Sequence, residues 1–236
     1  KHYPATPRFF SVNSLDFDPD PIAPVPTAWL QFLHQLFDDD IESQDLLQEW
    51  FGYCLTGNTA QQKMLLMVGP KRSGKGTIAR ILTRLVGIGN VCGPTISALA
   101  GPFGLQPLIG KSMAIVSDAR FHGEGITPVI ERLLCISGED TLTIDRKHMT
   151  SVTMKLPTRF VFLTNEFPRL NDASGALAGR FVILRLTESF YGKEDTELTQ
   201  RLMGELPGIL NWAIEGWQRL QKRGRFVMPS SVADAV

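Results

Sequence analysis

Apolar residues along this chain follow two kinds of pattern. Short, fully apolar runs of the kind that form buried strands occur between residues 61 and 195, separated by stretches of helical period. The predicted strands are 64–68, 112–118, 159–164 and 181–184. Strands that alternate with helices in this way predict an α/β core with a central, mostly parallel sheet.

A helical pattern precedes this core. Residues 27–60 predict a small helical domain, in which Thr27 caps the first helix and a second helix covers about 44–56. Before it, residues 1–26 are rich in Pro, Asp and Ser and have no period. This composition predicts an extended arm or linker.

The last part of the chain, residues 196–236, is helical again. Thr196 is the expected cap of a short segment, and Pro207 is the expected start of a longer helix. The chain begins without Met and stops in what looks like the middle of an element, so we expect a truncated fragment of a longer protein. The predicted division is an arm (1–26), a small helical domain (27–60), the core (61–195) and a C-terminal helical part (196–236).

A glycine-rich loop joins the first core strand to a helix. It comprises Gly69, Pro70, Lys71, Arg72, Ser73, Gly74, Lys75, Gly76 and Thr77. In such a loop the glycines let backbone N–H groups surround an anion, the helix N-terminus adds positive dipole, and Lys75 reaches the β- and γ-phosphates. The pattern predicts a site for ATP with Mg²⁺.

One position departs from the strict form of this motif. The residue after the lysine is usually Ser or Thr, whose hydroxyl binds magnesium, but here it is Gly76. The hydroxyl comes one step later, on Thr77, and one step turns a helical side chain by about 100°. Thr77 therefore does not simply replace the missing ligand, and we hypothesise that a water at Gly76 bridges to magnesium.

Two later strands end in polar side chains. Asp118 follows the strand 112–118 and is expected to hold magnesium, to orient water, or both. Asn165 follows the strand 159–164 and is expected to bind the γ-phosphate or the attacking water. Turn-forming Asp and Asn are also common at strand ends, which is the structural alternative at both positions.

Two further features carry positive charge. Residues 141–145 and 152–156 alternate apolar and polar, which predicts a β-hairpin whose connector 146–151 contains Arg146, Lys147 and His148. Such a tip is either a solvated turn or a contact for DNA. Arg180 stands before the last core strand, where it is either a surface residue or, in a ring of subunits, a group that reaches a neighbour's γ-phosphate.

The composition limits which partners and which cellular compartment fit the protein. The 236 residues carry 24 basic and 24 acidic side chains, so any nucleic-acid site must be a local patch. The three cysteines lie far apart in the sequence, which predicts buried thiols in a reducing compartment such as the cytoplasm. No apolar run is long enough to span a bilayer, and no signal peptide is expected.

The order of these motifs resembles the helicase part of phage and plasmid primase–helicases, in superfamily 3 of the AAA+ ATPases. The loop 69–77 is similar to the family's first motif, 114–120 to its second, and 162–165 to its third. The stretch 138–148 resembles the motif of the family's DNA-contacting hairpin, and Arg180 occupies the position of its arginine finger.

This resemblance implies an AAA+ P-loop ATPase core with a β-hairpin insertion and small helical parts at both ends. It implies a homo-hexameric ring that hydrolyses ATP at subunit interfaces and moves along single-stranded or replication-fork DNA. It also implies an N-terminal primase region in the full protein. The catalytic set would be Lys75, Asp118, Asn165 and Arg180, with Thr77 and Asp118 near magnesium and Arg146, Lys147 and His148 on DNA.

Two other functions are compatible with the sequence. The phosphate loop is also similar to that of adenylate kinases, which suggests a small-molecule phosphotransferase. An ATP-gated DNA-binding switch without translocation would use the same motifs. Phosphate transfer to AMP would distinguish the first, and strand displacement would distinguish the second.

Overall fold

The computed structural model describes residues 15–121, 125–168 and 175–233, so that parts of the predicted arm and of the loop before Arg180 lie outside the described residues. Five strands form a parallel sheet in the order β2-β3-β6-β1-β7. They are β1 (Met64–Val68), β2 (Val91–Cys92), β3 (Met113–Val116), β6 (Arg159–Thr164) and β7 (Phe181–Arg185). Because all five run the same way, their carboxyl ends share one edge.

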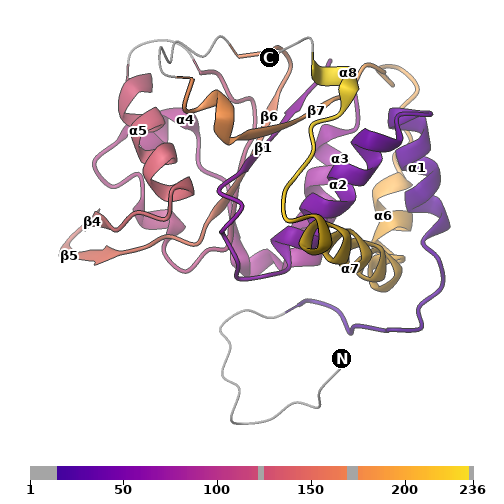
Figure 1. Ribbon diagram of the computed structural model, residues 1–236, viewed down its shortest axis with the longest axis horizontal. Helices are drawn as coiled ribbons and strands as arrows, with labels where there is room; N and C mark the ends of the chain where they lie inside the picture. The colour runs from indigo at the N-terminus through magenta and orange to yellow at the C-terminus, as the bar shows by residue number, and fades with distance from the viewer. Residues whose placement is uncertain (1–14, 122–124, 169–174, 234–236) are drawn as a thin grey trace.

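Helices cover both faces of this sheet (Figure 1). On one face lie α1 (Thr27–Phe37), α2 (Ile41–Cys54), α3 (Lys75–Val86), α6 (Leu198–Met203) and α7 (Leu206–Arg223), and on the other lie α4 (Ile96–Ala100) and α5 (Ile126–Ser137). Short elements complete the described chain: η1 (Ile88–Asn90), η2 (Gln106–Leu108), η3 (Ala178–Arg180) and α8 (Ser230–Ala233). The predicted α/β architecture is confirmed.

The strand β1 shows why two cores form. Leu65 and Met67 enter the hydrophobic core beneath α1, α2, α3 and α7, whereas Leu66 and Val68 enter the core beneath α4 and α5. Alternate strand residues point to opposite faces, so a strand buried on both sides must be apolar at every position. The continuous run 64–68 satisfies this requirement.

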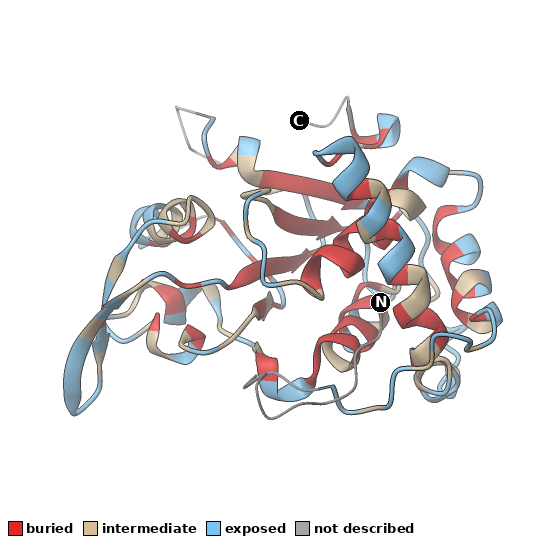
Figure 2. Ribbon diagram, turned by 60° about the horizontal axis from the view of Figure 1, so that its bottom comes forward, coloured by how far each residue is buried: buried red, intermediate tan, exposed pale blue. Residues whose placement is uncertain are grey.

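The predicted hairpin forms a second, two-stranded sheet that projects from the body (Figures 1 and 2). Its strands are β4 (Leu142–Arg146) and β5 (Met149–Met154). We expected a connector at 146–151, but Arg146 pairs with Met149, which leaves a tip of only Lys147 and His148. His148, the second residue of this tip, has φ 58°, in the left-handed region that some tight turns place at this position.

The helical parts from the two ends of the chain pack against each other through α2 and α7. Two glycines make this approach possible: a Cβ on Gly52 would lie 2.2 Å from the carbonyl oxygen of Ala213, and one on Gly216 would lie 2.4 Å from that of Gln48. Only hydrogen side chains fit at these contacts.

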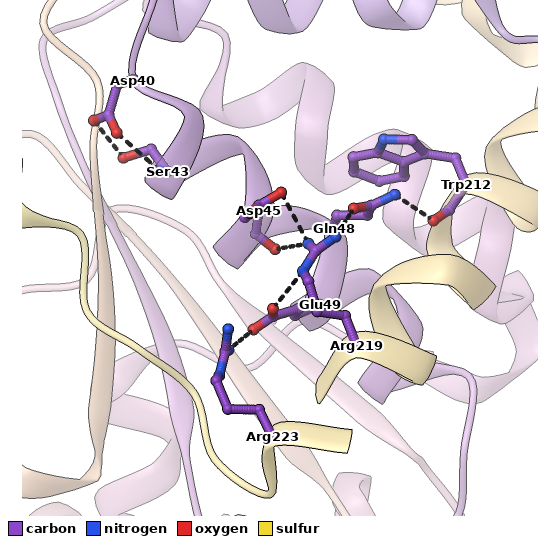
Figure 3. A network of polar contacts seen from close by, with 8 residues as sticks. All are labelled: Asp40, Ser43, Asp45, Gln48, Glu49, Trp212, Arg219 and Arg223. Atoms are coloured by element: carbon purple, nitrogen blue, oxygen red, sulfur yellow. Dashed lines mark hydrogen bonds and ion pairs between the residues drawn. The ribbon is translucent and has the colours of Figure 1, made fainter. Parts of the chain in front are cut away.

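A polar network reinforces the same crossing (Figure 3). The side chain of Glu49 is 1% exposed and lies between the guanidinium groups of Arg219 and Arg223. Arg219 also donates to Gln48 Oε1 at 2.7 Å. Gln48 in turn donates to the carbonyl of Trp212 at 2.8 Å. A buried carboxylate is tolerated where charged partners satisfy it, as they do here.

Helix starts differ from the predicted caps. Thr27 and Thr196 are wrong as caps: Thr27 is the first residue of α1, and Asp195 rather than Thr196 accepts the backbone N–H of Leu198 at the start of α6. The carboxylate of Glu205 accepts the N–H groups of Ala28 and Trp29 at 3.0 and 2.9 Å. A side chain distant in the sequence therefore caps α1.

The second helix starts earlier than predicted. It begins at Ile41 rather than near residue 44, because Asp40 accepts the backbone N–H of Ser43 at 2.9 Å and caps α2. Across the described residues, none of the helices is both long and apolar enough to cross a membrane.

Candidate functional site

The phosphate loop lies at the carboxyl edge of the sheet, between β1 and α3. The backbone N–H of Gly69 donates to the carbonyl of Thr164 at 3.2 Å, which ties the start of the loop to the end of β6. Gly74 precedes α3 with φ 88°, and a Cβ there would lie 2.8 Å from Leu36 of α1. Glycine is needed at this position both for its backbone conformation and for space.

Lys75 is the first residue of α3 and is buried, with 8% exposure. Its ammonium donates to the carbonyls of Gly69 and Pro70 at 2.6 and 2.7 Å and to Ser73 Oγ at 3.1 Å. Burial lowers the pKa of Lys75, and the charge of Asp118 partly opposes that shift. The loop thus wraps around the ammonium that is expected to meet the phosphates.

Asp118 and Asn165 lie at the same edge. Strand β6 is placed between β1 and β3, with Thr164 opposite Val68 and Phe162 opposite Val116. The residues that follow β3 and β6 therefore come out beside the loop, and both Asp118 and Asn165 line one cleft with Lys75. Asp118 has φ 50°, a conformation that Asp adopts more readily than most residues.

This cleft has a volume of about 950 Å³ and is walled by distant parts of the chain. One wall is α1, with Phe32 and Gln35. The other is formed by the segment that leads into α6, with Phe190, and by Arg201 of α6 itself. The volume lies within the range of small-molecule sites. No local pattern predicts these walls, because helical and loop residues far from the motif carry no signature of their own.

Two ion pairs cross or border the cleft. Arg72 of the phosphate loop pairs with Glu194 at 3.3 Å, and Arg201 of α6 pairs with Asp195. The N–H of Phe190 also donates to the carbonyl of Arg72 at 3.0 Å. The segment before α6 is therefore held against the phosphate loop by both backbone and side-chain contacts.

The residues at the metal position fit a magnesium ion that is carried by a nucleotide. Asp118 supplies one carboxylate in the cleft, and Gly76 supplies no hydroxyl. Thr77 Oγ1 accepts a hydrogen bond from Arg80 at 3.1 Å. The described residues contain no cluster of three or more His, Cys, Asp or Glu that could hold a metal ion alone. Magnesium commonly binds through one carboxylate, waters and phosphate oxygens, which matches this set.

Arg180 is not brought to the cleft. It precedes β7, at the amino end of the strand, while the phosphate loop is at the carboxyl edge. Its guanidinium donates to the side chain of Gln62, and nearby Lys63 donates to the carbonyl of Gly179. Burial and the charge of Arg180 lower the pKa of Lys63. The two cations form a pair that the sequence analysis did not identify.

The hairpin tip is exposed, and its backbone is anchored. The side chains of Lys147 and His148 face solvent, and Arg146 is partly buried. The N–H of Lys147 donates to Gln106 Oε1 at 2.9 Å. Three residues before Gln106, Phe103 is 42% exposed at a shallow apolar groove. Phe103 could not be singled out from the sequence, because a single aromatic residue in a Gly- and Pro-rich stretch carries no periodic signal.

Comparisons with known proteins give one family match and several solved structures of similar fold. The model of a family described as "Family of unknown function (DUF5906)" matches residues 67–180, just under half of the chain. The matched segment runs from the end of β1 to Arg180 and so contains the phosphate loop, Asp118, the hairpin and Asn165.

Solved structures extend the likeness to most of the chain. The apo structure of the NrS-1 C terminal region (305–718) gives a TM-score of 0.68 at 18% identity, over 92% of this chain and 59% of that one. The A form of that region gives a TM-score of 0.65 at 21% identity, over 84% of this chain and 48% of that one. The JCV helicase, bound to a thiazolopyridine acetamide compound, gives a TM-score of 0.52 at 21% identity, over 84% of this chain and 61% of that one.

These identities are low, so the likeness establishes the fold alone. This chain therefore shares the mixed α/β fold of these structures, one of which is the JCV helicase. The chain spans about half to three fifths of the structures that it matches. The activity of a whole protein of that kind is therefore a matter for proposal.

Proposed function

We propose that this chain is the ATPase domain of a ring-forming DNA helicase from a phage, prophage or plasmid replication protein. One observation carries the proposal: Lys75, Asp118 and Asn165, from three separate strand ends, line a single cleft of about 950 Å³ at the carboxyl edge of a parallel sheet. Phosphoryl transfer needs mainly positioning and charge stabilisation, and these residue types supply both.

Within one subunit, each residue has a distinct task. Lys75 exchanges its contacts with the loop carbonyls for the β- and γ-phosphates of ATP. Magnesium, held by Asp118 and the phosphates, would neutralise charge on the triphosphate. Asn165, exposed at the end of β6, donates its amide N–H to the γ-phosphate or orients the attacking water.

The second part of the site comes from a neighbouring subunit. Arg180 and Lys63 lie away from their own phosphate loop, at the opposite end of the strands, so neither serves the nucleotide of its own chain. In a closed ring, such as a homo-hexamer, one subunit's cations face the next subunit's cleft. There they would stabilise charge on the transferred phosphoryl group.

DNA binds at the hairpin. Lys147 and His148 lie at an exposed tip, where they contact phosphates without reading sequence. Phe103 offers a face on which a base can stack, close to the loop that anchors the tip. A link to an N-terminal primase region and action at a replication fork complete the proposal.

The test is ATP hydrolysis with and without single-stranded DNA, beside Lys75→Ala, on protein whose assembly state has been measured by light scattering. We expect an assembled protein with DNA-stimulated hydrolysis that Lys75→Ala abolishes. Transfer of phosphate to AMP would instead identify an adenylate-kinase-like enzyme. Lys75-dependent hydrolysis with DNA binding but no strand displacement would identify the ATP-gated switch.

A further inference from the structure

Among the arginines that line the cleft, Arg80 is the one for which the described residues provide no carboxylate partner. The cleft contains three arginines, and two of them are paired, Arg72 with Glu194 and Arg201 with Asp195. No ion pair in the described part of the chain includes Arg80. Its guanidinium donates only to two hydroxyls, Thr77 Oγ1 at 3.1 Å and Thr199 Oγ1 at 3.4 Å.

The exposed side chain of Arg80 adds positive charge to an end of the cleft that is already positive. Side chains on a helix lean toward its N-terminus, so Arg80 lies over the first turn of α3, above Gly76 and Thr77. The first turn carries unsatisfied N–H groups and the positive end of the helix dipole. The ammonium of Lys75 lies in the same turn. Three positive features therefore meet at one end of the cleft.

Gly76 is connected with this arrangement. A Cβ on residue 76 would lie 3.4 Å from Arg80 Nη1, which is already contact distance. The hydroxyl of a Ser or Thr would add an atom beside the guanidinium, which would have to shift or donate a hydrogen bond to it. The absence of the usual magnesium-binding hydroxyl and the presence of a guanidinium over the same turn are thus two aspects of one local structure.

We propose that Arg80 binds the phosphates of the nucleotide from within the same subunit, at the place left open by Gly76. Its planar group offers two parallel N–H donors to phosphate oxygens, which a magnesium-binding hydroxyl does not. The nucleotide is consequently held with less dependence on magnesium than in a loop with Ser or Thr after the lysine. This inference rests on the proposed nucleotide site.

The test measures equilibrium binding of ADP and of the non-hydrolysable analogue AMP-PNP by calorimetry, in Mg²⁺ and in EDTA. We expect Arg80→Gln to weaken binding about tenfold or more, since a charge-assisted hydrogen bond is involved, with the larger loss in EDTA. Arg80→Lys should restore part of the affinity. Gly76→Ser should lose affinity mainly in EDTA. Arg225→Gln removes an exposed charge outside the cleft and should change nothing.

The outcomes separate this inference from the proposed function. If the native chain binds nucleotide in a Lys75-dependent way, but Arg80→Gln and Gly76→Ser bind like Arg225→Gln in both buffers, the role of Arg80 is wrong and the site stands. If the native chain shows no Lys75-dependent binding in either buffer, both are wrong. If circular dichroism shows that Arg80→Gln does not fold, the nucleotide affinities of Arg80→Lys and Gly76→Ser in the two buffers decide whether Arg80 binds the phosphates.

Discussion

Asp118 stands at the end of β3 with its carboxylate in the cleft and contributes an opposing charge to Lys75. If it acts on water or metal rather than on nucleotide affinity, Asp118→Asn should leave AMP-PNP binding within a few fold while lowering ATP hydrolysis about a hundredfold or more. Calorimetry and ADP release measure the two quantities. Glu215→Gln, an exposed carboxylate on α7, is the matched control. An equal loss of AMP-PNP affinity and of ATP hydrolysis would show that Asp118 contributes to nucleotide binding rather than to the hydrolysis step.

Residues next to a strand end could be predicted from the sequence, and residues that act across space could not. Lys75, Asp118 and Asn165 each follow an apolar run, so the parallel sheet dictates where they emerge. Arg80 follows no such rule, because its significance depends on the missing side chain at Gly76. Glu205 was missed for the same reason, since it caps a helix that begins 178 residues earlier.

At the scale of elements, α2 and α7 are held together by a crossing that leaves no room for a methyl group. Gly216→Ala would place a Cβ 2.4 Å from the backbone of Gln48, which cannot rotate away as a side chain can. We expect a loss of about 1–3 kcal/mol in the free energy of unfolding. Urea denaturation measures it, with Gly89→Ala as the control, because a Cβ at Gly89 meets nothing within 4 Å. Equal stability of the two variants would contradict the close crossing.

In the proposed function, the hairpin is the element on which DNA binding depends. Lys147→Ala should weaken affinity for single-stranded DNA and lower the slope of log K against log salt by about 0.7 for each phosphate that the lysine neutralises. Fluorescence anisotropy at several salt concentrations gives both values. Lys155→Ala removes an exposed lysine beyond the end of β5 and should leave the slope unchanged. Identical slopes for both variants and the native chain would remove the tip from the DNA interface.

The length of the hairpin strands was harder to predict than their existence. The alternation of apolar and polar residues determines which segments pair, but the polar stretch 146–151 gives no alternation to follow. Pairing nonetheless continues to Arg146 and Met149, because His148 accepts a positive φ and closes a two-residue turn. The exact start of a helix is equally hard to predict. At α6 the backbone N–H of Leu198 is bonded by Asp195 rather than by the neighbouring Thr196.

At the scale of the whole molecule, the two halves of the proposed catalytic machinery lie at opposite ends of the strands. Mixing Arg180→Ala subunits with Lys75→Ala subunits should restore part of the ATPase activity, because some interfaces then join an intact loop to an intact arginine. ADP release from mixed assemblies measures the recovery. Mixing Arg180→Ala with the Arg180→Ala, Lys75→Ala double variant creates no such interface and should remain inactive. Absence of recovery in verified mixed rings would contradict a role in trans.

The alternation of strands and helices predicts that the sheet is parallel, but it does not give the order of its strands. Strand β6 lies between β1 and β3 and is buried on both faces, with Phe160 and Phe162 in the core beneath α4 and α5 and Val161 and Leu163 in the other core. No pattern within β6 itself encodes its neighbours. The walls of the cleft were unpredictable for the same reason.

The crossing of α2 and α7 also has a consequence for biosynthesis. Phe51 and Tyr53 of α2 pack against Trp212 and Trp217, and the hydrogen bond from Gln48 to Trp212 joins residues 164 positions apart. At translation rates of about 5–20 residues per second, the aromatic face of α2 is complete on the order of ten seconds or more before its cover is made. During that interval the growing chain presents an uncovered aromatic surface. Ribosome-bound chains that stop before α7 are therefore the forms on which a chaperone would act.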